Sequence, residues 1–234
     1  MTGNFINLFA ILLGSGVGIL FGARLSENLK TTVIAGMGLF TTAVGMQMFL
    51  KTENALIVLG ALILGAILGE WWGVEDGLQS LGIWFEKRLS GNSEGGSSRF
   101  VRGFLTASVL YCTGPMAVLG SISDGLRGDY LTLSIKSVLD GIISVAFAST
   151  LGIGVAFSAL PVFIYQGTIS LLAAQLNAIV TTSMMNEMTA TGGVLLIGIG
   201  FSSLLEIKKI RVGNFLPALA IAPIIVYVLS LIIK

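Results

Sequence analysis

Long apolar runs alternate with short polar loops along the chain, and this pattern predicts helices that span a membrane. About 20 consecutive apolar residues cross the hydrocarbon core of a bilayer. Eight runs approach this length, at residues 4–22, 33–50, 55–72, 101–123, 137–157, 161–180, 192–205 and 215–233. The fourth run is interrupted and the seventh is short. Seven full spans with one re-entrant element are therefore an open alternative to eight.

The composition supports an all-α, polytopic membrane helix bundle of about 7–8 transmembrane helices. Of the 234 residues, 54% are hydrophobic and 11% are charged, whereas a soluble domain carries about 25% charged residues. The mean hydropathy is +0.94. The runs are continuous rather than alternating, which favours helices over the strands of an outer-membrane barrel.

The longest polar stretch, residues 74–98, predicts two different elements. Val74, Leu78, Leu81 and Trp84 recur at roughly helical spacing among charged residues, as in a short helix that lies in the membrane interface. The following GNSEGGSS is typical of a flexible linker. This linker divides the chain into an N-terminal part, 1–98, with three spans and a C-terminal part, 99–234, with about five.

The basic residues of the loops predict the orientation. In the eight-span arrangement one side holds nine of them: Arg24, Lys30, Lys87, Arg88, Arg99, Arg102, Lys208, Lys209 and Arg211. The other side holds four: Lys51, Arg127, Lys136 and Lys234. Lys and Arg favour the cytoplasmic side, so we expect both termini outside the inner membrane of a bacterium. The net charge of +1 provides no basic field for nucleic acid.

The chemistry available to the chain argues against an enzyme. The sequence has no histidine and one cysteine, so the commonest metal ligand and proton shuttle is missing. It contains no Walker loop, no HExxH and no GxSxG motif. We therefore expect no catalytic residue, no metal site and no cofactor.

Glycines at intervals of four residues mark two helix faces. Gly14, Gly18 and Gly22 form one series, and Gly65 and Gly69 form another. Such spacing lets another helix backbone approach closely, which favours helix packing. The partner helix can belong to the same chain or to a second copy, so a homodimer is an open alternative.

The sequence CTGP interrupts the fourth apolar run at Thr113, Gly114 and Pro115. Proline removes a backbone donor and clashes with the preceding turn, so we expect a broken or re-entrant helix here. Backbone groups freed inside a membrane must face protein or a water-filled cavity. A polar cavity and an ordinary proline kink are the two interpretations.

The sequence TATGG provides a second candidate break at Thr189, Thr191 and Gly192. Hydroxyl groups followed by glycines suit a helix N-terminus whose N–H groups meet a polar group. The two breaks can then face each other. Plain capping of a helix at the membrane surface is the alternative.

Ionisable residues inside apolar runs are the remaining candidates. Lys136 and Asp140 are four residues apart and can pair on one helix face. Charges at membrane depth usually line a bundle interior or an ion path, although a neutralised pair with Lys136 extending to the interface is also consistent. Gln166 can line the same path or bond neighbouring helices. Asp124, Arg127 and Asp129 form a charged turn at the expected outer mouth, with a salt-bridged loop as the simpler interpretation.

The strings CTGPMAVLGSISDGLRGD, KSVLDG, EMTATGGVLLIGIG and IKKIRVGNFLPAL follow one another in this order. Together they resemble the bacterial membrane-protein family catalogued as domain of unknown function 554, over nearly the whole chain. The resemblance implies a multi-pass membrane protein and no assigned substrate. The positions that match the motifs are Thr113, Gly114, Pro115, Asp124, Gly125, Gly128, Asp140, Gly141, Thr189, Thr191, Gly192, Gly193, Asn214 and Pro217.

These features favour a small secondary transporter or exporter of an unidentified ion or small solute, embedded in the lipid bilayer. Thr113 to Pro115 would supply backbone and hydroxyl ligands, Asp140 balanced by Lys136 would be the ion or proton site, and Thr189, Thr191 and Gly192 would form a helix-terminus site. The alternative from a different class is a channel or a non-transporting scaffold that dimerises through its glycine faces.

Overall fold

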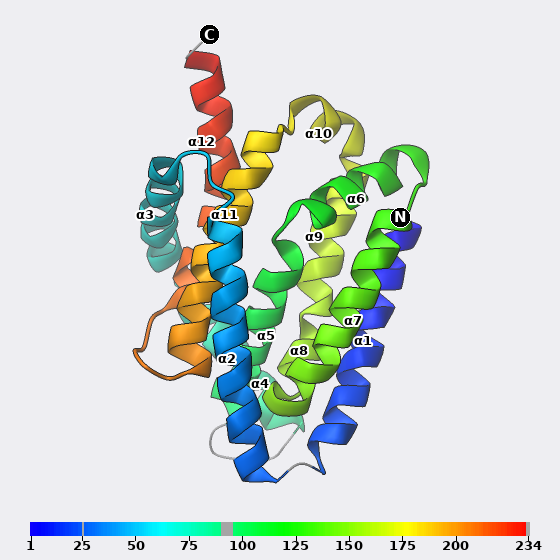
Figure 1. Ribbon diagram of the computed structural model, residues 1–234, viewed down its shortest axis with the longest axis vertical. Helices are drawn as coiled ribbons and strands as arrows, with labels where there is room; N and C mark the ends of the chain where they lie inside the picture. Colours follow the sequence, from blue (N-terminus) through cyan, green and yellow to red (C-terminus); the bar gives the residue numbers. More distant parts are fainter. Residues whose placement is uncertain (25, 90–95, 233–234) are drawn as a thin grey trace.

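The computed structural model describes residues 1–24, 26–89 and 96–232, and within these ranges it contains helices and no strands. The all-α prediction is confirmed (Figure 1). The helices are α1 (Thr2–Gly22), α2 (Glu27–Phe49), α3 (Ala55–Trp72), α4 (Val74–Leu89), α5 (Gly96–Cys112), α6 (Pro115–Arg127), α7 (Leu131–Leu151), α8 (Gly154–Phe157), α9 (Ala159–Leu171), α10 (Ala173–Ile179), α11 (Thr182–Ile199) and α12 (Ala218–Ile232).

Six helical segments in the described ranges are long and apolar enough to cross a membrane, or seven if the bent pair α5 and α6 counts as one span. Their outward side chains suit a lipid environment. Leu13, Leu20 and Leu56, for example, are 69%, 73% and 74% exposed. Helix α11 is not among these segments because it carries polar residues, and it lies buried between its neighbours.

The first three expected spans match α1, α2 and α3, and the later ones differ in their boundaries. The expected span at 137–157 instead runs over Leu131–Leu151, because Gly152 leaves the helical region with φ of 75°. The expected span at 161–180 is interrupted at Leu172, between α9 and α10. The helix expected at 192–205 begins ten residues earlier, at Thr182.

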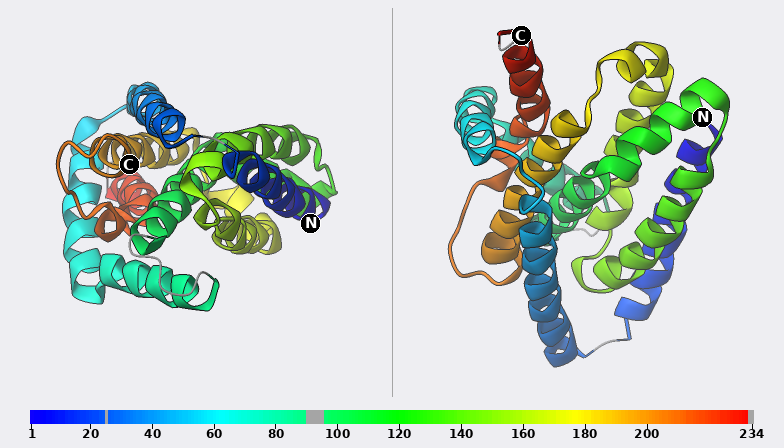
Figure 2. Two further views of the ribbon diagram at one scale, coloured as in Figure 1. Left: turned by 90° about the horizontal axis from the view of Figure 1, so that it is seen from below. Right: turned by 45° about the horizontal axis from the view of Figure 1, so that its top comes forward.

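The helices pack in two groups (Figures 1 and 2). Helix α1 lies along α7, and α6 and α9 pack with them; we call this group the first bundle. Helix α2 lies along α11, and α12 packs on both α11 and α3; we call this group the second bundle. Helix α5 lies between the bundles, since it contacts α7, α9 and α11.

The two stretches divided at residue 98 pack together. Helices α1, α2 and α3 lie against α7, α11 and α12 respectively. Whether the stretches are separate units stays a prediction. The expected linker at 91–98 lies partly outside the described residues, while residues 96–98 form the first turn of α5 instead. The helix expected in the polar stretch is present as α4, and its position in the membrane interface stays a prediction.

Glycines bring α1 into backbone contact with α7. A Cβ atom added at Gly14, Gly18 or Gly22 would overlap a backbone oxygen of α7, at Gly141, Val145 and Ser149 in turn. Gly65 and Gly69 of α3 make similarly close contacts with Ala218, the first residue of α12, and with the backbone of Asn214 in the segment before it. Both glycine faces are therefore filled inside this chain, which leaves no room on them for a second copy.

A buried carboxylate joins the α2–α3 loop to α11. Glu187 is 1% exposed. Its carboxylate accepts hydrogen bonds from Thr52 Oγ1 at 2.6 Å, from the backbone N–H of Glu53 at 2.7 Å and from that of Asn54 at 3.0 Å. These bonds satisfy backbone and hydroxyl donors of the loop between α2 and α3.

Glu53 of the α2–α3 loop also binds two side chains of α11. Its carboxylate accepts hydrogen bonds from Ser183 Oγ at 2.6 Å and from Asn186 Nδ2 at 2.7 Å. These two donors lower the pKa of Glu53 below 4.5, because they favour the charged form. The loop and α11 are thus tied by two carboxylates, one buried and one exposed.

The opposite end of α3 is tied to the segment before α12. Arg211 pairs with Glu70 at 2.7 Å and with Asp76 at 2.6 Å. Asn214 accepts a hydrogen bond from the backbone N–H of Glu75 at 2.8 Å and donates one to Glu70. Polar contacts therefore hold both ends of α3 within the second bundle.

The contact between α1 and α7 predicts that a larger side chain lowers the stability at Gly18 but not at Gly16. Gly18→Leu should lower the free energy of unfolding by about 1–3 kcal/mol or more, because the side chain would displace α1 from α7. Gly16→Leu should be neutral or slightly stabilising, since no atom lies within 4 Å of a Cβ there. Thermal unfolding in detergent compares the two variants, and equal losses would contradict the contact.

Substitution of the two carboxylates, Glu187 and Glu53, should lower the stability by different amounts. Glu187→Gln should destabilise by about 1–3 kcal/mol, because an amide N–H₂ would face backbone donors in a buried site. Glu53→Gln should cost less at this exposed position. The lowered pKa of Glu53 means that its contribution is complete above pH 4.5 and is lost as the pH falls further. Melting curves at several pH values should show the wild type and Glu53→Gln converging below pH 4.5, and a constant gap would argue against the assignment.

Candidate intramembrane polar site

The helix interruption expected at Thr113 to Pro115 is present. Helix α5 ends at Cys112 and α6 begins at Pro115. Gly114 between them has φ of 120°, a backbone conformation that glycine adopts readily and other residues avoid. The two helices are bent by 62° at this point. The sequence therefore places a sharp change of direction inside a segment of spanning length.

The break lies against Gly192 of α11. A Cβ atom at Gly192 would overlap the methyl group of Thr113, so the two residues touch across the bundles. The expectation that the two motifs face each other is confirmed. The Thr113 hydroxyl donates to the carbonyl of Val109 in its own helix. This bond uses the hydroxyl hydrogen and leaves the oxygen lone pairs available, so the role of Thr113 as a ligand stays a prediction.

The second expected break is wrong. Thr189, Thr191 and Gly192 lie inside α11, not at its start. The helix is capped earlier, at Thr181, whose side chain accepts a hydrogen bond from the backbone N–H of Met184 at 3.2 Å. The reason for the glycines is packing. Gly193 lies against Gly45 of α2, where a Cβ would come within 2.5 Å of the Gly45 carbonyl oxygen.

Lys136 and Asp140 form an ion pair that points into the first bundle. They lie one turn apart on α7, and their residues are 6% and 5% exposed. Their burial shows that Lys136 does not extend outward to the interface, so that interpretation is wrong. A charged pair inside a spanning helix requires other polar groups around it.

Side chains from three other helices surround this pair. Tyr111 of α5 places its ring 5.6 Å from Lys136 Nζ and shares a hydrogen bond of 2.8 Å with Ser144 of α7. Asn7 of α1 lies near the Asp140 carboxylate. Its Nδ2 also donates to Gln166 Oε1 of α9, at 3.3 Å. Gln166 thus bonds a neighbouring helix, which is one of its two interpretations, and its place on a path stays a prediction.

Three amide atoms at this cluster have no hydrogen-bond partner in the described part of the chain. They are Asn4 Oδ1, Asn7 Oδ1 and Gln166 Nε2, and all three residues are fully buried. A buried polar atom without a partner costs about 1–3 kcal/mol. Asn7 Oδ1 and Gln166 Nε2, one acceptor and one donor, suit a water molecule or a small polar species, while Asn4 lies against Phe163 and Gly167 of α9. The arrangement can thus bind a polar species inside the bundle.

The three charged residues at the α6–α7 turn, Asp124, Arg127 and Asp129, do not form one group. Asp124 is 2% exposed and accepts hydrogen bonds from the Met1 amino group at 3.0 Å and from the Gly3 N–H at 3.1 Å. It anchors the start of α1 and is not a mouth charge, which corrects that expectation. Asp129 is exposed and accepts a hydrogen bond from the Leu131 N–H at 3.1 Å, at the start of α7. Arg127 is exposed at the end of α6.

Sequence reasoning missed Asn4, Asn7 and Tyr111. A signal was present for the asparagines, because two amides three residues apart share one face of an otherwise apolar helix. Tyr111 directly precedes the break, but its partner Ser144 lies 33 residues away. No local pattern reveals such a contact.

The comparisons with known proteins agree with this architecture. A family model described as "Protein of unknown function (DUF554)" matches residues 2–227. The chain is 31% identical to the "Uncharacterized membrane protein YdfK" of Bacillus subtilis over 233 residues, which cover 98% of this chain and 97% of the relative. It is 32% identical to the "Uncharacterized protein YqgA" of Escherichia coli over 224 residues, covering 95% and 94%. No solved structure matches the chain. The buried polar cluster lies inside a bundle of apolar helices. The chain therefore belongs to the DUF554 family of membrane proteins.

Proposed function

We propose that the protein is a secondary transporter of an ion or small solute, with Lys136 and Asp140 as the site where a coupling ion or proton binds. The single observation that supports this role most is the buried pair on α7, in a cluster where Asn7 Oδ1 and Gln166 Nε2 have no partner among the described residues. A bundle that needed stability alone would be served as well by apolar side chains of similar volume.

The pair has two states that differ in charge distribution. When Lys136 neutralises Asp140, the site carries no net charge. A proton or a cation that binds Asp140 competes with Lys136 for the carboxylate and leaves the ammonium group without its partner. Binding then favours any conformation in which Lys136 finds other groups, and this differential affinity is what couples binding to a conformational change.

The two bundles provide a way to expose the site alternately. Helix α5 packs against both of them, and Thr113 just beyond its end meets Gly192 of α11, so the break lies at the boundary between the bundles. Broken helices between bundles are a common feature of secondary transporters. Thr189 and Thr191 lie in the same helix, with Thr189 Oγ1 buried and without a hydrogen-bond partner among the described residues.

We also propose a cytoplasmic position for the nine basic loop residues, in the bacterial inner membrane. Both termini lie in one half of the molecule, and the α1–α2 and α11–α12 loops lie in the other half (Figure 1). Lys and Arg in short loops favour the cytoplasmic side. Both termini would then face outward.

The scaffold alternative loses its motivating feature, because α7 and α12 fill the glycine faces. A homodimer through another surface, and the absence of enzymatic activity, stay predictions. A channel remains distinguishable from a transporter by kinetics, since the flux through a transporter saturates with solute.

The coupling role predicts the effect of neutralising the pair. The wild type in proteoliposomes should show saturable flux or dissipation of a gradient in a panel of ions and metabolites. The double variant Lys136→Gln/Asp140→Asn should lose the dependence of this flux on a pH or cation gradient, while its melting temperature changes little because no charge is left unpaired. Asp129→Asn at the exposed turn is the control. Gradient-driven flux that persists in the double variant would refute the coupling role.

The contact at the break predicts a compensating pair of variants. Gly192→Ala should slow transport about tenfold or more, because its methyl group would overlap that of Thr113 in the closed arrangement. Thr113→Ser removes the overlapping methyl and should restore part of the rate in the double variant. Gly198→Ala, which meets a side-chain methyl of Val212 at 3.3 Å, is the control. Equal rates in all four proteins would show that the contact has no part in transport.

A further inference from the structure

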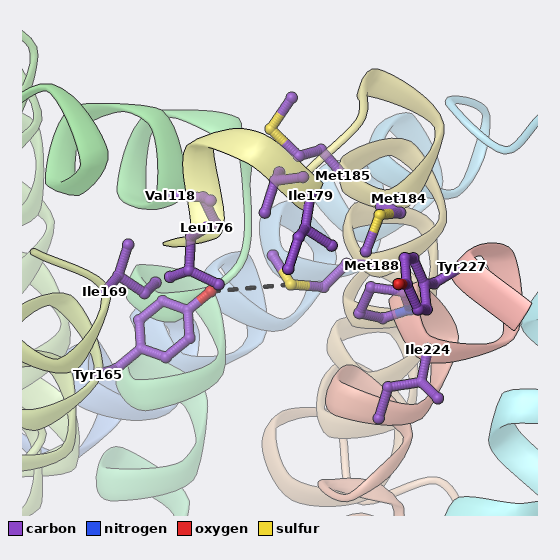
Figure 3. A pocket seen from close by; sticks show the side chains of 12 residues that line it. Val118, Tyr165, Ile169, Leu176, Ile179, Met184, Met185, Met188, Ile224 and Tyr227 are labelled. Carbon is purple, nitrogen blue, oxygen red and sulfur yellow. Dashed lines mark hydrogen bonds between the residues drawn. The ribbon is translucent and has the colours of Figure 1, made fainter. Parts of the chain in front are cut away.

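An apolar cleft separates the two bundles in the half of the molecule that holds the termini (Figure 3). Its volume is about 290 Å³. One wall comes from α6, α9 and α10, and the other from α11 and α12. Tyr165 and Ile169 line the first wall, and Met184, Met188 and Tyr227 line the second.

The walls define what the cleft can hold. None of the described residues that line it carries a charge, and apart from the two tyrosine hydroxyls the side chains are apolar. An inorganic ion, a sugar or an amino acid would lose its hydration there without gaining partners, which is strongly unfavourable. The cleft therefore suits a lipophilic molecule and does not suit a hydrophilic one.

The Tyr165 hydroxyl provides one polar anchor. It points across the cleft, and its partner there is Met188 Sδ at 3.7 Å (Figure 3). A thioether is a weak acceptor, so a ligand with a carbonyl or ether oxygen would form a stronger bond with the same hydroxyl. The three methionines, Met184, Met185 and Met188, have flexible and polarisable side chains that adapt to different ligand shapes.

The size of the cleft favours a compact solute over a whole lipid tail. Helix α10 arches between α9 and α11 (Figure 1), and Leu176 and Ile179 on it line the cleft. Its volume lies near the lower limit of ligand pockets, which span about 300–1,000 Å³.

The cleft also adjoins the break. Val118, which lines it, lies one turn after Pro115 on α6, and Met188 lies one turn before Gly192 on α11. A solute in the cleft would thus sit directly beside the Thr113–Gly192 contact. Movement of the bundles at that contact would change the shape of the cleft.

We infer that this cleft is the solute site of the transporter and that the solute is a small, neutral, lipophilic molecule with a hydrogen-bond acceptor for Tyr165. That the solute is transported rests on the proposed function, and the lining of the cleft adds the chemical class of the solute. The ion site at Lys136 and Asp140 and the solute site in the cleft are then separate.

Benzophenone, a neutral lipophilic ketone, tests the binding of such a solute directly. Under near-ultraviolet light it inserts into nearby C–H bonds, with a preference for methionine. In the full chain in nanodiscs, labelling of Met184, Met185 and Met188 should saturate with benzophenone concentration. Met46 on α2, which is 55% exposed, reports simple partitioning into lipid and should label without saturation.

Three variants sharpen this test. Ile224→Trp should abolish saturable labelling, because it fills the cleft from α12. Leu231→Trp, on the same helix at a 59% exposed position outside the cleft, should leave it unchanged. Tyr165→Phe should raise the half-saturating concentration about three- to tenfold through loss of one hydrogen bond. Retention of each melting temperature shows that the variants fold.

The outcomes separate the two proposals. Labelling at the three methionines that does not saturate, or that persists in Ile224→Trp, overturns the cleft site. A co-purified lipid whose removal alone permits labelling assigns the cleft to an acyl chain and also overturns it. Saturable labelling in a protein that shows no flux supports the binding site and refutes transport. Flux of a hydrophilic solute without saturable labelling supports transport and refutes the binding site in the cleft.

Discussion

Close approach of helix backbones at glycine is the constraint on which the rest of this structure depends. In a bilayer, burial of apolar surface between helices gives little driving force, because lipid tails are as apolar as leucine. Packing contacts must therefore be dense. Glycines of α1, α2 and α3 provide this density against α7, α11 and α12, with Gly45 and Gly193 contacting each other reciprocally.

The polar cluster follows from one of these contacts. Because Gly14 and Gly18 hold α1 against α7, Asn7 on the preceding turns of α1 reaches Asp140. Gln166 approaches from α9 to complete the group. The ion pair, the amides and the Tyr111–Ser144 hydrogen bond are thus assembled from four helices. The same contact that gives the first bundle its stability positions the groups that can bind an ion.

The second bundle is fixed in addition by polar contacts at both ends of α3. Glu187 satisfies the α2–α3 loop, and Arg211 and Asn214 hold the α3–α4 corner. Helix α5 packs between the two bundles, Thr113 just beyond its end meets Gly192 of α11, and the cleft opens beside this contact. Two groups of helices that meet at a broken helix suit a rearrangement of one group against the other. This division connects the ion pair, the break and the cleft in one mechanism.

The sequence by itself determined the class of the protein, the positions of α1 to α4, the interruption at Thr113 to Pro115 and the pairing of Lys136 with Asp140. Each of these follows from local rules: apolar length, the effect of proline and glycine on a helix, and the spacing of four residues on one face. The tertiary structure decided what lies opposite each feature. It placed TATGG inside α11, because Thr181 caps that helix earlier and Gly193 packs against α2. It also buried Asp124 against the start of α1 and brought Asn7 to Asp140. Such partners lie more than a hundred residues apart, and the packing of whole helices brings them together, which no local pattern encodes.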